Sequence, residues 1–327
     1  MNILNNNLNI VPLNIFIDPQ YPVERAIITH AHADHAKPGH KMVLGTKETL
    51  DIMKIRYGKN CAKHFQVLKY GEELKIDGIK ISLHPAGHIL GSSQVLINKN
   101  DYKYLITGDF KTVKDGTTTN FEVIGCNTLI IEATFGLPIF QHPCPNSEIK
   151  KLIKSIKINK NNCHIVGSYA LGKAQRVIKL LRDNSFDETI YIHGALEKIC
   201  NYYQEQGISL GNLEKIPLKK SQNFNGKVIL APPSATKDRW SRKFSNKILS
   251  QASGWMSVKQ RVKRSLVELP LIISDHSDWN ELTETIINTN AENVWITHGR
   301  EDGLMYWCKK KGINSKPLAL SGREDER

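Results

Sequence analysis

His30-Ala31-His32-Ala33-Asp34-His35 places four side chains of the types that bind metals in proteins within six residues. The stretch follows Ala26-Ile27-Ile28-Thr29, an apolar run that predicts a buried strand. A strand that leads into alternating histidines can direct two imidazoles at one metal ion, while the next two side chains point elsewhere as the chain turns. Zinc favours imidazole and carboxylate ligands, and open coordination positions make such a site catalytic. The alternative, a polar loop that is rich in histidine by chance, does not explain ligand spacing this dense.

Other predicted strands also deliver a histidine or an aspartate at their ends. The segments that end in His88, Asp109 and His298 are Ser82-Leu83-His84-Pro85-Ala86-Gly87-His88, Tyr104-Leu105-Ile106-Thr107-Gly108-Asp109 and Asn293-Val294-Trp295-Ile296-Thr297-His298. Each is weak evidence alone, because Thr-Gly-Asp is more often a turn than a metal site. Together they place candidate ligands at the carboxyl ends of strands, where open sheets usually hold their chemistry.

This order of residues resembles the metallo-β-lactamase fold, and three further segments resemble the β-CASP nuclease branch of that fold. They are Ile131-Glu132-Ala133-Thr134 for the acidic motif A, Ser274-Asp275-His276-Ser277 for motif B and Thr297-His298-Gly299 for motif C in its histidine form. The similarity continues through Ser168-Tyr169-Ala170-Leu171-Gly172-Lys173-Ala174-Gln175-Arg176. Over nearly the whole chain, the sequence most resembles the bacterial ligase-associated DNA exonucleases.

The resemblance implies two zinc ions, with manganese as the alternative metal. It assigns one ion to His30, His32 and His88, the other to Asp34, His35 and His298, and the bridging position to Asp109. Asp18 follows the apolar segment Asn14-Ile15-Phe16-Ile17 and is expected to orient a ligand histidine from behind. The alternative for Asp18 is a turn residue before Pro19.

The resemblance also implies an acid catalyst. A leaving nucleoside oxygen needs a proton, which His276 can supply when a carboxylate such as Glu132 orients it. Without the family pattern, Glu132 reads equally well as a salt-bridged residue at a strand end. Asp34 is expected to act in catalysis as well as in metal binding, and Asp278 to cap the helix that begins near Trp279.

For substrate binding, the sequence points to basic residues. Lys173 and Arg176 lie one helical turn apart at a helix start led by glycine, where backbone amides can hold a phosphate. The residues 237–243 combine four basic side chains with Trp240, a pattern that suits a single strand. The alternative for any one of these lysines is a solvated basic face.

Composition agrees with a polyanionic partner. The chain has 327 residues, a net charge of +13 and a pI near 9.3. An AT-rich genome that favours lysine codons would explain part of this excess. The six cysteines form no Cys-x-x-Cys pair, which indicates reduced thiols and a cytoplasmic protein. Neither a signal peptide nor a membrane span is expected.

The expected fold is α/β: an αββα metallo-β-lactamase sandwich with an inserted α/β β-CASP domain. The first part of the sandwich is predicted over residues 1–139, the insert with parallel strands over 140–266 and the C-terminal return over 267–327. A helix is predicted over residues 147–158 with Ser147 as its N-cap. The return is expected to begin with a buried strand over residues 267–274 that leads to His276.

The predicted function is a metal-dependent DNA exonuclease that acts in repair with an ATP-dependent DNA ligase and a DEXH-type helicase. The main alternative is an RNA-processing nuclease of the same fold, because His298 departs from the valine that DNA-cleaving relatives of the Artemis type carry in motif C. A catalytically dead scaffold subunit is disfavoured because every expected ligand position is retained. A small-molecule hydrolase is disfavoured by the insert and by the pair Glu132 and His276.

Overall fold

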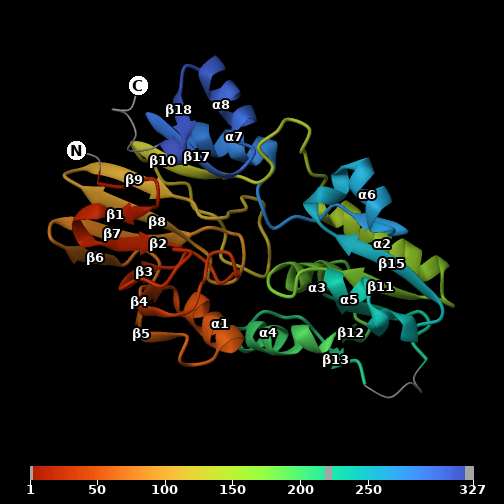
Figure 1. The fold of residues 1–327 in the computed structure, drawn as a ribbon. Helices are drawn as coiled ribbons and strands as arrows, with labels where there is room; N and C mark the ends of the chain where they lie inside the picture. Colours follow the sequence, from red (N-terminus) through yellow and green to blue (C-terminus); the bar gives the residue numbers. More distant parts are fainter. Residues whose placement is uncertain (1–2, 218–222, 321–327) are drawn as a thin grey trace. The chain divides into compact units, whose positions relative to one another are not determined.

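A computed structural model describes residues 3–217 and 223–320 of the chain (Figure 1). The chain has mixed α/β structure and divides into two compact units. Unit 1 joins residues 1–141 to residues 276–327, and unit 2 is the segment 142–275 between them. No helix in the described part of the chain is long and apolar enough to cross a membrane.

Unit 1 contains two sheets. The five-stranded sheet has the order β1 (Asn9–Ile10), β2 (Ile15–Ile17), β3 (Arg25–Ile27), β4 (His40–Gly45), β5 (Ala62–Val67). The seven-stranded sheet has the order β18 (Asn314–Pro317), β17 (Asn293–Gly299), β10 (Thr128–Ala133), β9 (Tyr102–Ile106), β8 (Ser93–Lys99), β7 (Ile79–Pro85), β6 (Glu73–Ile76). Strands β6 to β9 form antiparallel hairpins, whereas β9, β10, β17 and β18 run parallel.

Helices cover the outer face of each sheet in unit 1. The helical segments are η1 (Val11–Leu13), α1 (Lys47–Tyr57), α7 (Trp279–Asn288), α8 (Glu301–Lys310) and η4 (Leu318–Leu320). One apolar core lies between the two sheets and includes Ile17, Ile27 and Ile81. A second core packs α7 and α8 on the seven-stranded sheet through residues such as Leu129, Leu282 and Leu304. With α1 against β4, the layers of unit 1 are helix, sheet, sheet and helix (Figure 1).

Unit 2 is a parallel sheet with helical crossovers. Its order is β13 (Leu213–Lys215), β12 (Ile190–Ile192), β14 (Val228–Ala231), β11 (Cys163–Gly167), β15 (Lys247–Ala252), β16 (Leu269–Leu271). The helical segments are α2 (Pro145–Ile158), α3 (Lys173–Asp183), α4 (Gly194–Glu205), α5 (Pro233–Lys237), η2 (Arg239–Lys243), η3 (Gly254–Ser257) and α6 (Lys259–Ser265). All of its strand pairs are parallel, as the alternation of helices and strands predicts.

Local sequence explains where two functional helices begin. Asp278 caps α7, and its side chain accepts a hydrogen bond from Glu281 N at 3.1 Å, as predicted. The N-cap predicted for α2 is wrong by three residues. The helix begins at Pro145, because proline needs no N–H partner in the first turn, and the Ser147 hydroxyl donates instead to the Cys144 carbonyl.

The segment after residue 266 also differs from expectation. Its strand, β16, is only three residues long and pairs with β15, so it extends the sheet of unit 2 rather than returning the chain to unit 1. The boundary between the units follows Asp275, immediately before His276. The last seven residues of the expected C-terminal segment lie outside the described residues.

Candidate metal centre

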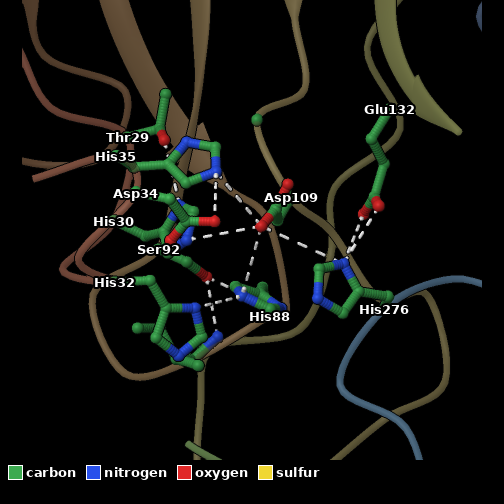
Figure 2. Close-up of polar contacts among 12 residues, drawn as sticks. Thr29, His30, His32, Asp34, His35, His88, Ser92, Asp109, Glu132 and His276 are labelled. Carbon is green, nitrogen blue, oxygen red and sulfur yellow. Dashed lines mark hydrogen bonds and ion pairs between the residues drawn. The ribbon is translucent and has the colours of Figure 1, made fainter. Parts of the chain in front are cut away.

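The predicted ligands of unit 1 meet at the ends of several strands (Figure 2). The segment that begins at His30 follows β3, His88 follows β7, Asp109 follows β9, and His298 lies near the end of β17. Of the five groups whose ligand atoms all lie within 4.8 Å of one another in the described part of the chain, two consist of predicted ligands alone: His30, His32, His88 and Asp109 in one, and His35, Asp109 and His298 in the other. Asp109 is common to both groups, and its bridging role stays a prediction.

The carboxylate of Asp109 is the centre of this arrangement. Its Oδ2 lies 3.5 Å from His30 Nε2 and 3.3 Å from His35 Nε2. The same oxygen lies 3.8 Å from His88 Nε2 and 4.0 Å from His276 Nδ1. Four imidazoles therefore surround one oxygen atom of a side chain that is almost fully buried.

Asp18 determines which nitrogen of His35 carries the proton. Its Oδ2 lies 2.8 Å from His35 Nδ1, and an ionised carboxylate only accepts hydrogen bonds. Nδ1 must therefore donate, so the lone pair of a neutral His35 ring is on Nε2. That lone pair faces the Asp109 carboxylate at 3.3 Å.

Thr29, which sequence reasoning did not single out, extends the same control to His30. Its hydroxyl donates to Asp18 Oδ2 at 2.5 Å, so it can only accept from His30 Nδ1, 3.1 Å away. The lone pair of His30 is thus also on Nε2. The backbone N–H of Thr29 donates to the other Asp18 oxygen at 2.8 Å, which fixes the carboxylate itself. One aspartate therefore orients two imidazoles, as metal-binding histidines require.

The lone pairs of His30 and His35 show whether a metal ion fits between these side chains. His30 Nε2 and His35 Nε2 are buried and have no hydrogen-bond partner in the described part of the chain. Two electron-rich nitrogens and a carboxylate oxygen at 3.3 to 3.5 Å repel one another unless a cation lies between them. The residues therefore fit a divalent metal, and the mixture of imidazole and carboxylate suits zinc.

The pKa values of His30, His35 and Asp109 are all shifted by burial and by one another's charge. Burial and the neighbouring His35 hold the pKa of His30 well below its usual range. Burial also lowers the pKa of His35, but the carboxylates of Asp109 and Asp18 outweigh this effect and raise it well above the usual range. Burial opposes ionisation of Asp109, yet the imidazoles of His35 and His276 hold its pKa well below the usual range. Without a metal, the site therefore favours an ionised Asp109 and a protonated His35.

Asp34 is an exposed member of the predicted ligand set. Its side chain is 75% exposed, and its Oδ2 is 3.9 Å from His35 Nε2 (Figure 2). It belongs to neither of the groups above. Its backbone carbonyl accepts a hydrogen bond from Gln20 Nε2 at 2.5 Å, which anchors the turn but leaves the carboxylate at the surface. Its roles in metal binding and catalysis stay predictions.

A β-bulge sets the position of His298. The pairing of β10 with β17 shifts between Glu132, opposite Thr297, and Ala133, opposite Gly299, so His298 is the extra residue. His298 has a φ of 53°, and its ring stacks on His35 with centroids 5.0 Å apart. Gly299 permits this path, because a Cβ there would lie 2.0 Å from the Ala133 carbonyl oxygen.

Glu132 and His276 form the pair that the resemblance implied. His276 Nδ1 lies 3.0 and 3.2 Å from the two Glu132 oxygens. Glu132 is 1% exposed, and it also accepts hydrogen bonds from Phe110 N at 2.8 Å and from the Thr134 hydroxyl at 2.5 Å. His276 Nδ1 therefore donates to Glu132, and the role of His276 as an acid stays a prediction.

A buried ion pair joins the loop after Asp109 to the helix after His276. Lys111 Nζ donates to Glu281 Oε2 at 2.6 Å, and both side chains are buried. The other Glu281 oxygen accepts from Val113 N at 3.1 Å. The Ser277 backbone N–H also donates to the Phe110 carbonyl at 2.8 Å. These contacts hold Asp109 and His276 at a fixed separation, and no sequence motif had pointed to Lys111.

The two predicted phosphate-binding residues lie in unit 2 and are buried. Lys173 forms an ion pair with Asp275, and Arg176 Nη1 donates to the Ser274 carbonyl at 2.6 Å. Each residue is 3% exposed. The helix start led by Gly172 is as predicted, but these contacts turn both cations toward the segment that precedes His276. The substrate-binding roles of Lys173 and Arg176 stay predictions.

Asp18→Asn should weaken zinc binding by changing which nitrogen of His35 carries the proton. An amide can donate to His35 Nδ1, which would move the proton to Nε2 and block it as a ligand. We expect zinc affinity to fall by about 10- to 100-fold, as is typical for groups that orient ligands. Isothermal titration with zinc measures this change.

Asp77→Asn is the matched control for Asp18→Asn. Asp77 also has a left-handed backbone, with φ 47° against 48° for Asp18, but it lies exposed in a turn. Thr29→Val should weaken zinc binding mainly through His30, because the Asp18 carboxylate that orients His35 remains. Equal zinc affinity in Asp18→Asn and the unaltered protein would refute the assigned tautomers.

Several known proteins are similar to this chain in sequence. The chain is 26% identical to a "Probable DNA ligase" of Opitutus terrae, over 95% of this chain and 32% of that protein. It is 28% identical to an "RNase J-like protein" of Methanocaldococcus jannaschii, over 53% of this chain and 48% of that protein. It is 27% identical to "RNase aCSPSF2" of Saccharolobus solfataricus, over 56% and 44%. The chain is similar to proteins named as nucleases.

The chain spans only about a third to a half of the length of these relatives. No family model matches the sequence. A crystal structure of a protein of unknown function from Enterococcus faecalis V583 has a similar fold. Its TM-score is 0.61 at 12% identity, over 91% of this chain and 79% of that one, so this likeness concerns the fold alone.

Proposed function

We propose that this chain is a metal-dependent nuclease of the β-CASP branch of the metallo-β-lactamase fold, and that it hydrolyses phosphodiester bonds in DNA. The observation that carries the proposal is the group of imidazoles around Asp109 Oδ2, with the pair Glu132 and His276 beside it. The layers of unit 1 and the inserted parallel sheet of unit 2 support the family assignment. The relatives named as ribonucleases support hydrolysis of nucleic acid.

The residues have distinct roles in the proposed reaction. His30, His32 and His88 would hold one metal, His35 and His298 the other, with Asp109 between them and Asp34 completing the second site from the surface. Zinc bound there, or manganese as the alternative, supplies Lewis acidity and lowers the pKa of coordinated water. His276 holds a proton at Nε2 for the leaving oxygen, and Glu132 stabilises the imidazolium through Nδ1.

Charge supports a polyanionic substrate. The lysines and arginines outside residues 142–275 equal the aspartates and glutamates there in number, so the net charge of +13 lies entirely in unit 2. An AT-rich genome would raise the lysine content of both units alike. The partition therefore reflects function better than codon usage.

DNA as substrate, exonuclease action and a role in repair beside a DNA ligase and a helicase rest on the resemblance to ligase-associated exonucleases. The relative named as a DNA ligase, which matches 95% of this chain, supports the same direction. An RNA-processing nuclease is the second candidate. It is favoured by the relatives named as ribonucleases and by His298 at the end of β17.

The deciding experiment uses 5′- and 3′-end-labelled single strands of DNA and RNA with matched sequence, incubated with zinc or manganese and resolved by length. We expect DNA to be cut at least as fast as RNA, with a ladder that shortens from one end. A chelator should stop the reaction. A strict preference for RNA would favour the second candidate, and no cleavage of either polymer under any metal would refute both.

A further inference from the structure

Trp240 lies in unit 2 among aromatic and basic side chains that the candidate metal centre does not use. Its ring meets His193 at 4.8 Å and Phe244 at 5.3 Å, with interplanar angles of 70° and 66°. Lys243 Nζ lies 5.1 Å from the centroid of the Trp240 ring. No ring of the described residues stacks flat on Trp240, which is only half-buried. Part of the ring packs against the apolar core of unit 2, and its exposed part is the surface that a flat partner would contact.

The cations around Trp240 have no anionic partner among the described residues. The residues are Lys237, Arg239, Arg242 and Lys243, and none of them makes an ion pair with a described carboxylate. By contrast, Lys173, Lys179 and Lys215 of the same unit are each paired with an acidic side chain. Unpaired cations that gather beside an aromatic ring are costly to maintain unless they meet an external anion.

His193 lies beside Lys243 and adds a further polar group to the surroundings of Trp240. Burial lowers the pKa of His193, and the nearby Lys243 ammonium lowers it further. His193 Nδ1 accepts a hydrogen bond from Ala195 N at 3.0 Å, which fixes the ring at the start of α4. His193 directly follows β12, and α5 follows β14, so the group lies where parallel sheets usually bind ligands.

We propose that the Trp240 cluster, defined as His193, Trp240 and Lys243 with the exposed Lys237, Arg239 and Arg242, binds single-stranded nucleic acid. One unpaired base stacks on Trp240, and the basic side chains hold the adjacent phosphates. A duplex is excluded as the preferred ligand because its bases offer no free face to an aromatic ring. The inference deepens the proposed nuclease function by naming a second contact with the substrate, outside the metal centre.

The test measures binding without cleavage. The full-length chain is titrated into dye-labelled oligothymidylate in the presence of EDTA, and fluorescence anisotropy gives the affinity at several salt concentrations. Trp240→Leu should weaken binding by about tenfold, while Trp240→Phe, which keeps a ring, should retain most of it. Arg239→Ala/Arg242→Ala should weaken binding and reduce the slope of log affinity against log salt by about 1.4.

Lys154→Ala/Lys157→Ala is the matched control, because it removes two exposed charges of unit 2 from α2, neither of which lies over an aromatic ring of the described residues. It should leave affinity nearly unchanged, and a duplex of the same length should bind more weakly than the single strand. Equal losses in the arginine pair and the lysine pair would overturn the proposal in favour of a general basic field. Full affinity in Trp240→Leu, confirmed as folded by its melting temperature, would also overturn it.

Binding of oligothymidylate in EDTA can be measured independently of nuclease activity. If the chain is not a nuclease, cleavage is absent while the Trp240 cluster still binds oligothymidylate. If the cluster is not a binding site, the same variants bind normally in EDTA whether or not the metal-loaded protein cleaves.

Discussion

Asp109→Ala should remove both metals and abolish cleavage. Asp109 Oδ2 is the only carboxylate oxygen of the described residues that lies within 4.0 Å of four imidazoles, so its loss removes the one buried carboxylate that both candidate sites share. Because a bound metal contributes several kcal/mol to catalysis, turnover should fall by at least about a thousandfold. Elemental analysis of the purified variant measures the metal, and the end-labelled DNA assay measures the activity.

Glu284→Ala provides the control for Asp109→Ala. Glu284 is an exposed carboxylate of α7 in the same unit, and its removal should change neither metal content nor turnover. The melting temperature of Asp109→Ala should also be measured, because the buried imidazoles lose their anionic partner. Two metal ions retained in folded Asp109→Ala would contradict the bridging assignment.

His276→Ala and Glu132→Gln should each slow turnover by about a hundredfold or more while the metals stay bound. His276 Nδ1 donates to Glu132 at 3.0 Å, so either change removes the oriented imidazolium that protonates the leaving oxygen. The assay compares an oligonucleotide with a thymidine 5′-(p-nitrophenyl phosphate) substrate. Nitrophenolate leaves without a proton, so its release should be nearly normal in both variants.

This comparison distinguishes acid catalysis from a metal-binding role. Asp109, Glu132 and His276 also lie close enough together to share a cation, so a metal-ligand role for His276 is the alternative. Loss of a metal in His276→Ala, or equal slowing with both substrates, would contradict the acid role. His64→Ala, which removes an exposed histidine of β5, should behave like the unaltered protein.

Short-range patterns predicted most of the candidate metal centre. The ligands within 30–35 are neighbours in sequence, and backbone geometry largely sets the directions of their side chains. His88, Asp109 and His298 were predictable because each follows a strand in a sheet whose chemistry gathers at one edge. The pairing of Glu132 with His276 came from the resemblance alone, since no spacing rule relates residues separated by 144 positions.

The sequence by itself therefore determined the mixed α/β class, the parallel sheet of unit 2 and the histidines and aspartates around Asp109. Tertiary structure alone decided which charges are buried and which nitrogens carry protons. It placed Lys173 and Arg176 against residues about a hundred positions away, and it made Thr29 the link between Asp18 and His30. It also left the cations around Trp240 without partners and placed Asp34 at the surface. The physical reason is that periodicity and spacing are local, whereas burial and hydrogen-bond partners depend on which distant segments fold together.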